Sequence, residues 1–226
     1  MLRAKGHLVT AVDLPARWAR PEVAAATTPA DFVESVGQVV RASPLPVVLV
    51  GHSLGGATIS MVAEAYPDKV ARLVYVTAFL VPPGETVRYI SMSDKASLIP
   101  SSIRRDASTR TTTVIPEKAK DVFYADCSDD DVRIALQLLC AEPSTMGEAR
   151  MLLSEERFGR VERVYVECLQ DRAISIGTQR AMHAKLPCRK VFTLDSSHSP
   201  FLSNAEQLSD ILGSLACTGF GCVNTL

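Results

Sequence analysis

The feature that most constrains this chain is a serine bracketed by glycines, Gly51-His52-Ser53-Leu54-Gly55. The apolar run 47–50 before it predicts a buried strand, and the stretch 57–66 after it predicts a helix. A serine at such a junction sits on a tight turn with strained backbone angles, and flanking glycines remove Cβ atoms that would clash there. The sequence therefore predicts that Ser53 ends a strand as an exposed nucleophile.

The helix that follows Ser53 would assist such a nucleophile electrostatically. Its N-terminus points at the serine, where free backbone N–H groups favour developing negative charge. We expect the backbone N–H of Leu54 to be one donor of an oxyanion hole, the group of donors that holds a negatively charged oxygen. The alternative interpretation is a glycine-rich turn that contains an incidental serine.

Apolar runs and helical stretches alternate along most of the chain, which predicts parallel strands joined by crossover helices. One helix has a clear start, with Thr28 as its N-cap and Pro29 at the first helical position. Residues 16–26 are expected to form a loop. The expected strands are 8–12, 47–50, 73–76, 164–166 and 191–194, and the expected helices are 29–42, 57–66, 176–186 and 205–215.

The alternation breaks over residues 80–156, which we call the cap segment. It contains Pro82-Pro83-Gly84, a stretch rich in Ser, Thr and Arg at 101–113, and an expected helix at 128–140 with Ser128 as N-cap. It shows no strand alternation. We therefore expect one domain over residues 1–226, with 80–156 as a helical cap insertion.

A nucleophilic serine needs a base, and the chain has 4 histidines. His198 lies in the polar loop after the last expected strand, where α/β sheets place active-site groups, so we expect it to be the base. His52 adjoins Ser53, and the turn directs its side chain away from the hydroxyl. His7 enters the first expected strand, and His183 is expected on the surface of a helix.

The acid that orients this histidine should lie between the serine and the histidine in sequence. Asp171 follows the expected strand 164–166 and is the favoured candidate, since it could meet the histidine beyond the neighbouring strand. Asp195 is the alternative, and Glu167 is expected to lie within the strand. The acid fixes the tautomer of the imidazole and stabilises the imidazolium.

Several stretches carry a family resemblance: 6–14, 51–56, 66–70 and, most specifically, 154–216 with Gln170-Asp171-Arg172 and Ser197-His198-Ser199-Pro200. They resemble the plant methylesterase and hydroxynitrile lyase group of α/β-hydrolases and its bacterial relatives, including pyrethroid-hydrolase-like esterases. Asp126-Cys127-Ser128 looks like the cap of the bacterial members. The resemblance implies an α/β-hydrolase fold, with a mostly parallel sheet flanked by helices. It also implies a catalytic triad of Ser53, Asp171 and His198.

The chain also departs from that group. In lyase members a lysine follows the catalytic histidine and a cysteine commonly follows the nucleophile, whereas Ser199 and Leu54 stand here. This favours ester hydrolysis. Group members begin with a further strand whose His-Gly loop supplies a second oxyanion donor, and Met1 falls after that unit. The resemblance thus implies an N-terminally truncated chain without that donor, in which strand 8–12 lacks its neighbour or pairs with 47–50.

Charge and cysteine usage exclude other classes. Lys and Arg total 24 and Asp and Glu total 25, which gives no bulk attraction to nucleic acid or an anionic membrane. No apolar run reaches the ~18 residues of a membrane-spanning helix. Without a C-x-x-C pair or zinc spacing, we expect no metal or organic cofactor and a cytoplasmic location. Cys168 and Cys188 are expected to be buried free thiols, and Cys217 and Cys222 could pair.

Three functions are compatible with these features. The favoured one is a serine-dependent carboxylic ester hydrolase, acting on a small hydrophobic ester through an acyl-enzyme, with the cap segment lining the pocket. The second is a truncated, weak or inactive hydrolase-fold protein that binds a ligand, and the third is a hydroxynitrile lyase. A homodimer is also expected if a sheet edge is exposed.

Overall fold

The computed structural model describes residues 1–216, apart from the side chain of Pro21, so Cys217 and Cys222 lie outside the described residues. Its centre is a parallel four-stranded sheet in the order β1-β2-β6-β7. The strands are β1 (Val47–Ser53), β2 (Val70–Ala78), β6 (Glu162–Cys168) and β7 (Lys190–Leu194). The predicted parallel arrangement is therefore confirmed for these four strands.

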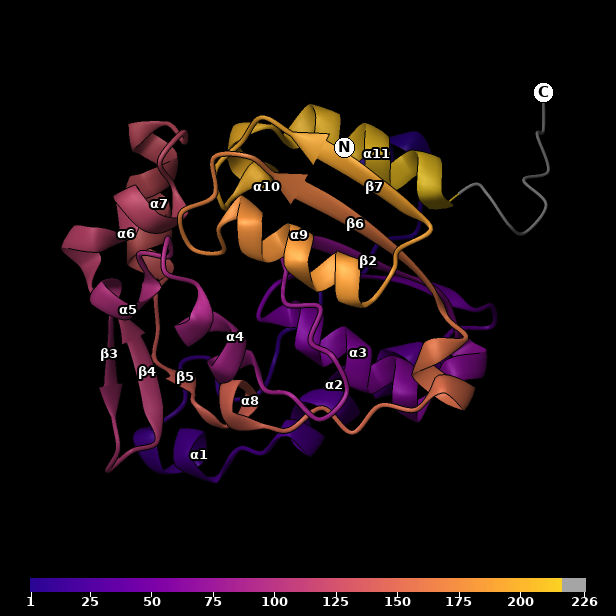
Figure 1. The fold of residues 1–226 in the computed structure, drawn as a ribbon, viewed down its shortest axis with the longest axis horizontal. Helices are drawn as coiled ribbons and strands as arrows, with labels where there is room; N and C mark the ends of the chain where they lie inside the picture. Colours follow the sequence, from indigo (N-terminus) through magenta and orange to yellow (C-terminus); the bar gives the residue numbers. More distant parts are fainter. Residues whose placement is uncertain (217–226) are drawn as a thin grey trace.

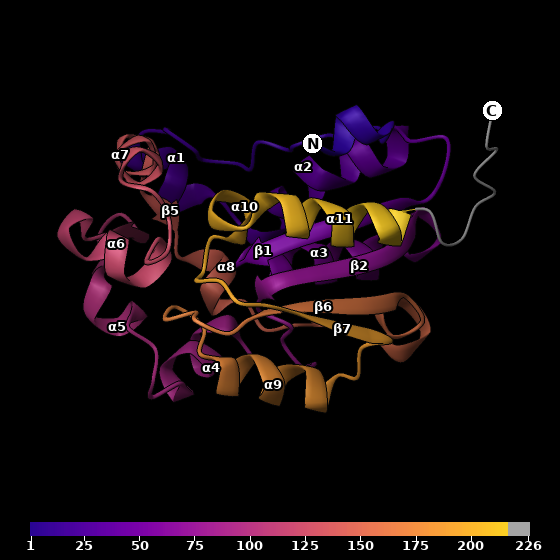
Figure 2. The ribbon, with the colours of Figure 1, turned by 90° about the horizontal axis from the view of Figure 1, so that it is seen from above.

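Alternate strand residues enter two cores on opposite faces of the sheet. Leu73 and Tyr75 of β2 join Tyr165 of β6 in the core beneath α2, α3 and α9, while Val74 and Val76 face α11. Figure 2 shows α9 and α11 on opposite sides of the sheet. These helices are α2 (Pro29–Ala42), α3 (Gly55–Ala65), α9 (Ile176–Lys185) and α11 (Ala205–Ala216). Burial on both faces explains why the interior strands β2 and β6 are apolar along most of their length.

The expected first strand, residues 8–12, is wrong. These residues have no ladder partner, Leu8 is 100% exposed, and β1 pairs only with β2 within residues 1–216. A strand forms only where a neighbour satisfies its backbone groups, and apolar composition alone does not supply that neighbour. Direct pairing of 8–12 with 47–50 is likewise wrong, and β1, which carries Ser53, is an edge strand of the described sheet.

The cap segment lies at the carboxyl end of the central strands, beyond the arrowheads of β6 and β7 (Figure 1). It is not purely helical, because it contains a second, antiparallel sheet of order β3-β4-β5. A hairpin turn starts at Asp106, whose carboxylate accepts hydrogen bonds from the backbone N–H groups of Ser108 (2.8 Å) and Thr109 (3.3 Å). The elements are α4 (Val87–Ser93), α5 (Ile99–Ser102), β3 (Ile103–Asp106), β4 (Thr111–Val114), α6 (Pro116–Phe123), α7 (Asp129–Leu138), β5 (Glu142–Pro143) and α8 (Thr145–Glu148).

Helix starts follow the sequence signals closely. Thr28 and Asp31 form the capping box of α2, and Ser128 caps α7 by accepting a hydrogen bond from the backbone N–H of Asp131 (3.1 Å). A short helix, α1 (Pro21–Ala26), stands where a loop was expected. Its six residues are too few to show helical periodicity. The remaining short helices are η1 (Leu2–Lys5), η2 (Pro67–Lys69), η3 (Glu155–Gly159) and α10 (Pro200–Ser203).

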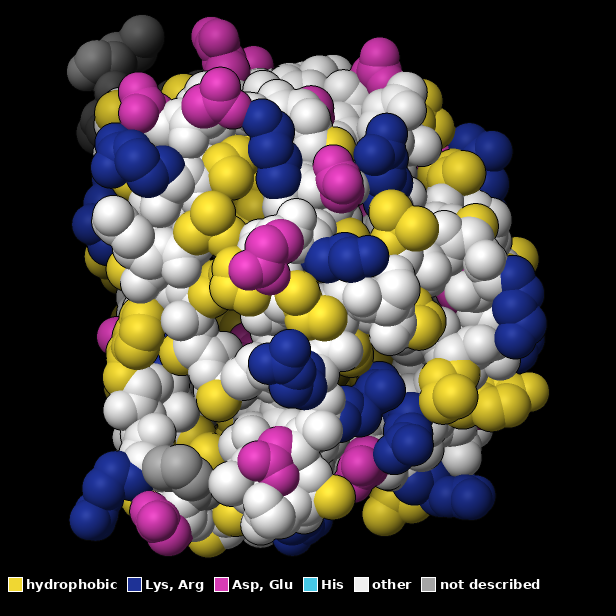
Figure 3. Space-filling model, turned by 90° about the vertical axis from the view of Figure 1, so that its left-hand side faces the viewer, with side chains coloured by type: hydrophobic (Ala, Val, Ile, Leu, Met, Phe, Trp, Pro, Cys, Tyr) yellow, Lys and Arg dark blue, Asp and Glu magenta, His cyan; other side chains and the backbone are white. Residues whose placement is uncertain are grey.

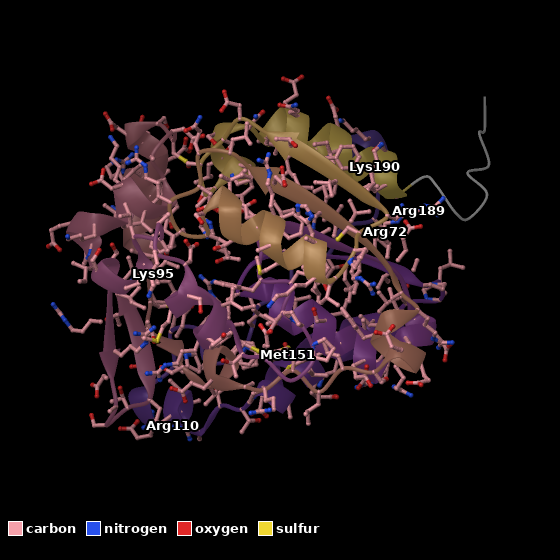
Figure 4. All side chains as sticks on the ribbon, viewed as in Figure 1. Arg72, Lys95, Arg110, Met151, Arg189 and Lys190 are labelled. Atoms are coloured by element: carbon pink, nitrogen blue, oxygen red, sulfur yellow. The ribbon has the colours of Figure 1, made fainter. Side chains whose placement is uncertain are left out.

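Charged side chains distribute differently at the two ends of the sheet. At the amino ends of the strands, Arg72 and Arg189 both form ion pairs with Glu162. Figure 4 shows these two arginines and Lys190 together, away from Lys95 in the cap segment. The cap face carries basic and acidic side chains scattered among apolar ones (Figure 3). None of the helices in residues 1–216 combines the length and hydrophobicity needed to cross a bilayer.

Candidate active site

The end of β1 holds Ser53 in a strained conformation. Its φ is 52°, in the left-handed region that costs a non-glycine residue about 1–3 kcal/mol. A Cβ on Gly51 would lie 2.7 Å from the carbonyl oxygen of Gly55, so the turn requires glycine there. A Cβ on Gly55 would meet nothing within 4 Å, whereas one on Gly56 would lie 2.6 Å from the carbonyl oxygen of Phe79. The expectation that Gly55 relieves a clash is therefore wrong, and Gly56 has that role.

The Ser53 hydroxyl makes no hydrogen bond to any residue that the structure describes. The backbone of Ser53 is fixed, because its carbonyl oxygen accepts a hydrogen bond from the N–H of Phe79 (3.0 Å), just beyond β2. Leu54 is the N-cap residue of α3, so its N–H stands outside the helical ladder and next to the serine. The turn thus presents a free hydroxyl on a rigid support at a helix N-terminus.

His198 and Asp171 form a buried pair beside this turn. The Nδ1–H of His198 donates a hydrogen bond to Oδ2 of Asp171 (2.7 Å), and these two side chains are 2% and 0% exposed. The alternative acid, Asp195, is exposed and accepts a hydrogen bond from Nε2 of Gln170 (3.1 Å). Glu167 lies within β6, as expected. Of the three acids considered from sequence, only Asp171 contacts His198.

Several donors hold the Asp171 carboxylate in place. Its Oδ1 accepts hydrogen bonds from the backbone N–H groups of Ala173 (2.6 Å) and Ile174 (2.9 Å). The hydroxyl of Thr77, at the end of β2, donates to Oδ2, the oxygen that also contacts His198. Burial alone would raise the pKa of Asp171, but the His198 charge and these hydrogen bonds outweigh it, so the pKa lies below its ordinary value. The carboxylate is therefore ionised at neutral pH.

His52 supports His198 from the other side. Its Nε2 lies 2.7 Å from the backbone carbonyl oxygen of His198, and its ring centroid lies 4.5 Å from that of His198. Because a carbonyl oxygen only accepts, His52 carries its proton on Nε2. Burial lowers the pKa of His52 to about 3, so this ring is neutral under ordinary conditions. Sequence reasoning placed His52 away from the Ser53 hydroxyl but gave no sign of its contact with His198.

The expected surface position of His183 is wrong. Its side chain is only 18% exposed, and its Nε2 lies 2.8 Å from Oε1 of Glu167. Arg180 and Thr193 also contact the Glu167 carboxylate, so this cluster fastens α9 to β6 and β7. Within residues 1–216, no group of three or more His, Cys, Asp or Glu is arranged to hold a metal ion.

The cysteines of the described chain are Cys127, Cys140, Cys168 and Cys188, and all four are free. Cys168 is buried, as expected, while Cys188 is only partly buried. Burial raises the pKa of Cys127 and of Cys188 to about 11, so both thiols are protonated and unreactive at neutral pH.

Comparison with known proteins identifies the fold and its relatives. A model described as "Alpha/beta hydrolase family" matches residues 1–211. A pyrethroid hydrolase of Sphingobium wenxiniae is 29% identical over 242 residues, covering 96% of this chain and 80% of the relative. Methylesterase 3 of Arabidopsis thaliana is 29% identical, covering 95% and 88%. An alpha-hydroxynitrile lyase of the same plant is also 29% identical, covering 96% and 89%.

Solved structures give the same grouping. A pyrethroid hydrolase from Sphingobium faniae superposes with a TM-score of 0.83 at 27% identity, covering 95% of this chain and 88% of that chain. Tomato methylketone synthase I superposes with a TM-score of 0.82 at 22% identity, covering 95% and 89%. At that identity the second likeness concerns the fold alone.

Proposed function

The chain belongs to the alpha/beta hydrolase family, and we propose that it is a serine-dependent carboxylic ester hydrolase. The observation that carries the proposal is the buried hydrogen bond of 2.7 Å between Nδ1 of His198 and Asp171, next to a serine held at a φ of 52°. Its esterase and hydrolase relatives, at 29% identity, support the same reaction class.

In the proposed reaction Ser53, His198 and Asp171 act as nucleophile, base and orienting acid. Nε2 of His198 takes the proton of the Ser53 hydroxyl as Oγ attacks the ester carbonyl carbon. The backbone N–H of Leu54 and the N-terminus of α3 stabilise the oxyanion. The imidazolium then protonates the leaving alkoxide, and water, activated by His198, releases the acid from the acyl-enzyme. Asp171 keeps the Nδ1 proton in place throughout.

We propose a small hydrophobic ester as the substrate, with the cap segment lining its pocket. The Phe123 ring of the cap lies 5.5 Å from the His198 ring, measured between centroids, so the cap presents apolar surface to the base. The lyase relative matches as closely as the esterases do, at 29% identity, so overall similarity does not separate these reactions. Ser199 and Leu54, where lyases of the group commonly carry lysine and cysteine, favour hydrolysis.

The direct test uses a fluorophosphonate probe and a series of p-nitrophenyl esters. We expect the probe to label the protein, short-chain esters to be hydrolysed, and Ser53→Ala to lower kcat by about 10⁴-fold or more. Ser101→Ala, an exposed serine of the cap segment, is the matched control and should behave as wild type.

The other functions predict different results in the same assay. A ligand-binding protein would fold and bind an ester analogue but leave probe and esters untouched. A lyase would release cyanide from an aromatic cyanohydrin. Either outcome, or equal hydrolysis by Ser53→Ala, would overturn the proposed function.

We also propose a cytosolic location, which the four free cysteines in residues 1–216 support, because oxidising compartments favour disulfides. Cell fractionation tests it. The expected homodimer remains a prediction that size-exclusion chromatography with light scattering would check.

A further inference from the structure

Three successive residues of the loop after β7, Ser196 to His198, are held by three different parts of the molecule. The carbonyl oxygen of Ser196 accepts a hydrogen bond from the N–H of Gln170 (3.0 Å), in the loop that carries the acid. The carbonyl oxygen of His198 contacts His52, in the serine turn. Between them, Ser197 is held by Asp126, which comes from the cap segment.

Asp126 binds Ser197 through both carboxylate oxygens. The backbone N–H of Ser197 donates to Oδ2 (2.8 Å), and the Ser197 hydroxyl donates to Oδ1. The two residues are 71 positions apart, with Asp126 in the turn between α6 and α7. Ser197 is only 1% exposed, so without Asp126 its buried donors would lose their partner.

Asp126 is charged, which strengthens both contacts. Burial would raise the pKa of Asp126, but the hydrogen bonds from Ser197 outweigh it and hold the pKa below its ordinary value. Hydrogen bonds to an ionised carboxylate are roughly twice as strong as those between neutral groups. The side chain therefore acts as a firm clamp although Asp126 itself reaches the surface.

The cap segment also forms hydrogen bonds with the loop after β6 that carries Asp171. The hydroxyl of Ser97 donates to the carbonyl oxygen of Ala173 (2.7 Å), and the N–H of Leu98 donates to that of Arg172 (2.8 Å). Phe123, three residues before Asp126, packs its ring against His198. The cap thus contacts both loops whose side chains form the acid–base pair.

We propose that Asp126 is a positioning residue for His198. By clamping Ser197 it fixes the backbone from which the imidazole projects, and so sets the distance between Nε2 and the Ser53 hydroxyl. The inference rests on the proposed function, because it assigns His198 the role of base. It makes the cap segment part of the proton-transfer geometry as well as a wall of the pocket.

Three variants test the clamp. Asp126→Ala removes both acceptors, and misalignment of the base should lower kcat between about 10- and 100-fold with little change in KM. Asp126→Asn keeps an acceptor for the Ser197 N–H and can donate to the Ser197 hydroxyl, so it should recover most of the activity. Asp121→Ala removes an exposed cap carboxylate of the same charge from α6 and should match wild type.

Two further measurements separate positioning from stability. The rate of fluorophosphonate labelling should fall with kcat in Asp126→Ala. The downfield proton resonance of His198 Nδ1–H should broaden or shift in that variant but not in Asp121→Ala. Melting curves accompany each variant. If Asp126→Ala does not fold, Ser197→Ala supplies the test, since it removes the hydroxyl contact alone and should lower kcat by about 3-fold.

The outcomes distinguish the inference from the proposed function. If Ser53→Ala abolishes hydrolysis while Asp126→Ala behaves like Asp121→Ala, the clamp is refuted and the esterase stands. If kcat of Asp126→Asn falls as far as that of Asp126→Ala, hydrogen bonds to Ser197 do not by themselves align the base, which also refutes positioning. If Ser53→Ala hydrolyses esters normally, the proposed function fails first, and an unchanged Nδ1–H resonance in Asp126→Ala would then reject the clamp independently.

Discussion

Thr77 is the residue whose conformation is hardest to explain without the site. It is completely buried and β-branched, yet its φ is 35°, in a region such residues rarely enter. Its hydroxyl donates to the Asp171 oxygen that also contacts His198. We infer that the surrounding structure imposes this backbone so that the hydroxyl reaches the carboxylate, because strain of this kind concentrates at functional sites.

Replacing Thr77 by valine should alter both catalysis and acid stability. The pKa of Asp171 is lower in the folded protein than in the unfolded chain. The ionised carboxylate therefore contributes its full stabilisation of the fold above the unfolded pKa of about 3.9, and this contribution is lost as pH falls through the folded pKa. Thr77→Val removes one donor and raises the folded pKa, so acid unfolding should begin at higher pH. Circular dichroism during acid titration measures the midpoint, and kcat should fall by about 10-fold.

The exposed residue Thr10 supplies the control, since Thr10→Val should leave the acid midpoint in place. An unchanged midpoint in Thr77→Val as well would contradict the role assigned to the hydroxyl.

Among single residues, the sequence points to the proposed catalytic groups more readily than to their supports. A motif marks Ser53 and a strand-end position marks Asp171, and the structure places Asp171 against His198. Thr77, Asp126 and the contact of His52 could not, because each depends on which distant loop the fold brings alongside. His183 was misread for the same reason, since its partner Glu167 lies on another element.

The junction between β1 and α3 shows how an element boundary is enforced. A Cβ on Gly56 would also lie 3.0 Å from the Ala78 Cβ, so α3 packs directly on the end of β2. Gly55, one residue earlier in the same helix, faces open space. Two adjacent glycines of one motif therefore carry different constraints.

Alanine at these two positions should have opposite effects on folding. Gly56→Ala should reduce the free energy of unfolding by about 1–3 kcal/mol, because the backbone at Phe79 must move. Gly55→Ala should leave it unchanged or raise it by up to about 1 kcal/mol, because alanine favours the helix. Urea unfolding compares them. Equal losses in both variants would show that the junction is not packed as described.

Element prediction succeeded for all four strands of the central sheet. The interior strands β2 and β6 are mostly buried, whereas β1 and β7 are partly exposed and were recognised from short apolar runs alone. Residues 8–12 are equally apolar but have no ladder partner, so the same signal misleads. In the cap segment, β3 is mostly exposed and polar, so its sequence does not indicate a strand. In β4, the run of threonines indicates strand structure.

For the whole molecule, the order of strands predicts a gradient of stability across the sheet. Strands β2 and β6 are paired on both sides, whereas β1 and β7 are the edges of the described sheet. Val50, in the middle of β1, is 47% exposed. The strand that ends in Ser53, the proposed nucleophile, is therefore paired through one ladder only within the described sheet.

Hydrogen–deuterium exchange should reveal this gradient. Amides of β2 and β6 should exchange slowest, while the β1 amides that point away from β2 should exchange quickly. Native mass spectrometry of the same sample shows whether the protein is a monomer or a dimer. Protection of β1 equal to that of β2 in a monomer would contradict the open edge, and the same protection in a dimer would show that a second copy covers it.

The open edge of β1 also affects how this protein loses activity on heating. We expect fraying of this one ladder to loosen the turn that holds Ser53, while the interior strands keep their neighbours. Activity should therefore disappear several degrees before the molecule melts, and cooling should restore it. A preparation judged intact by its melting curve could therefore already be inactive.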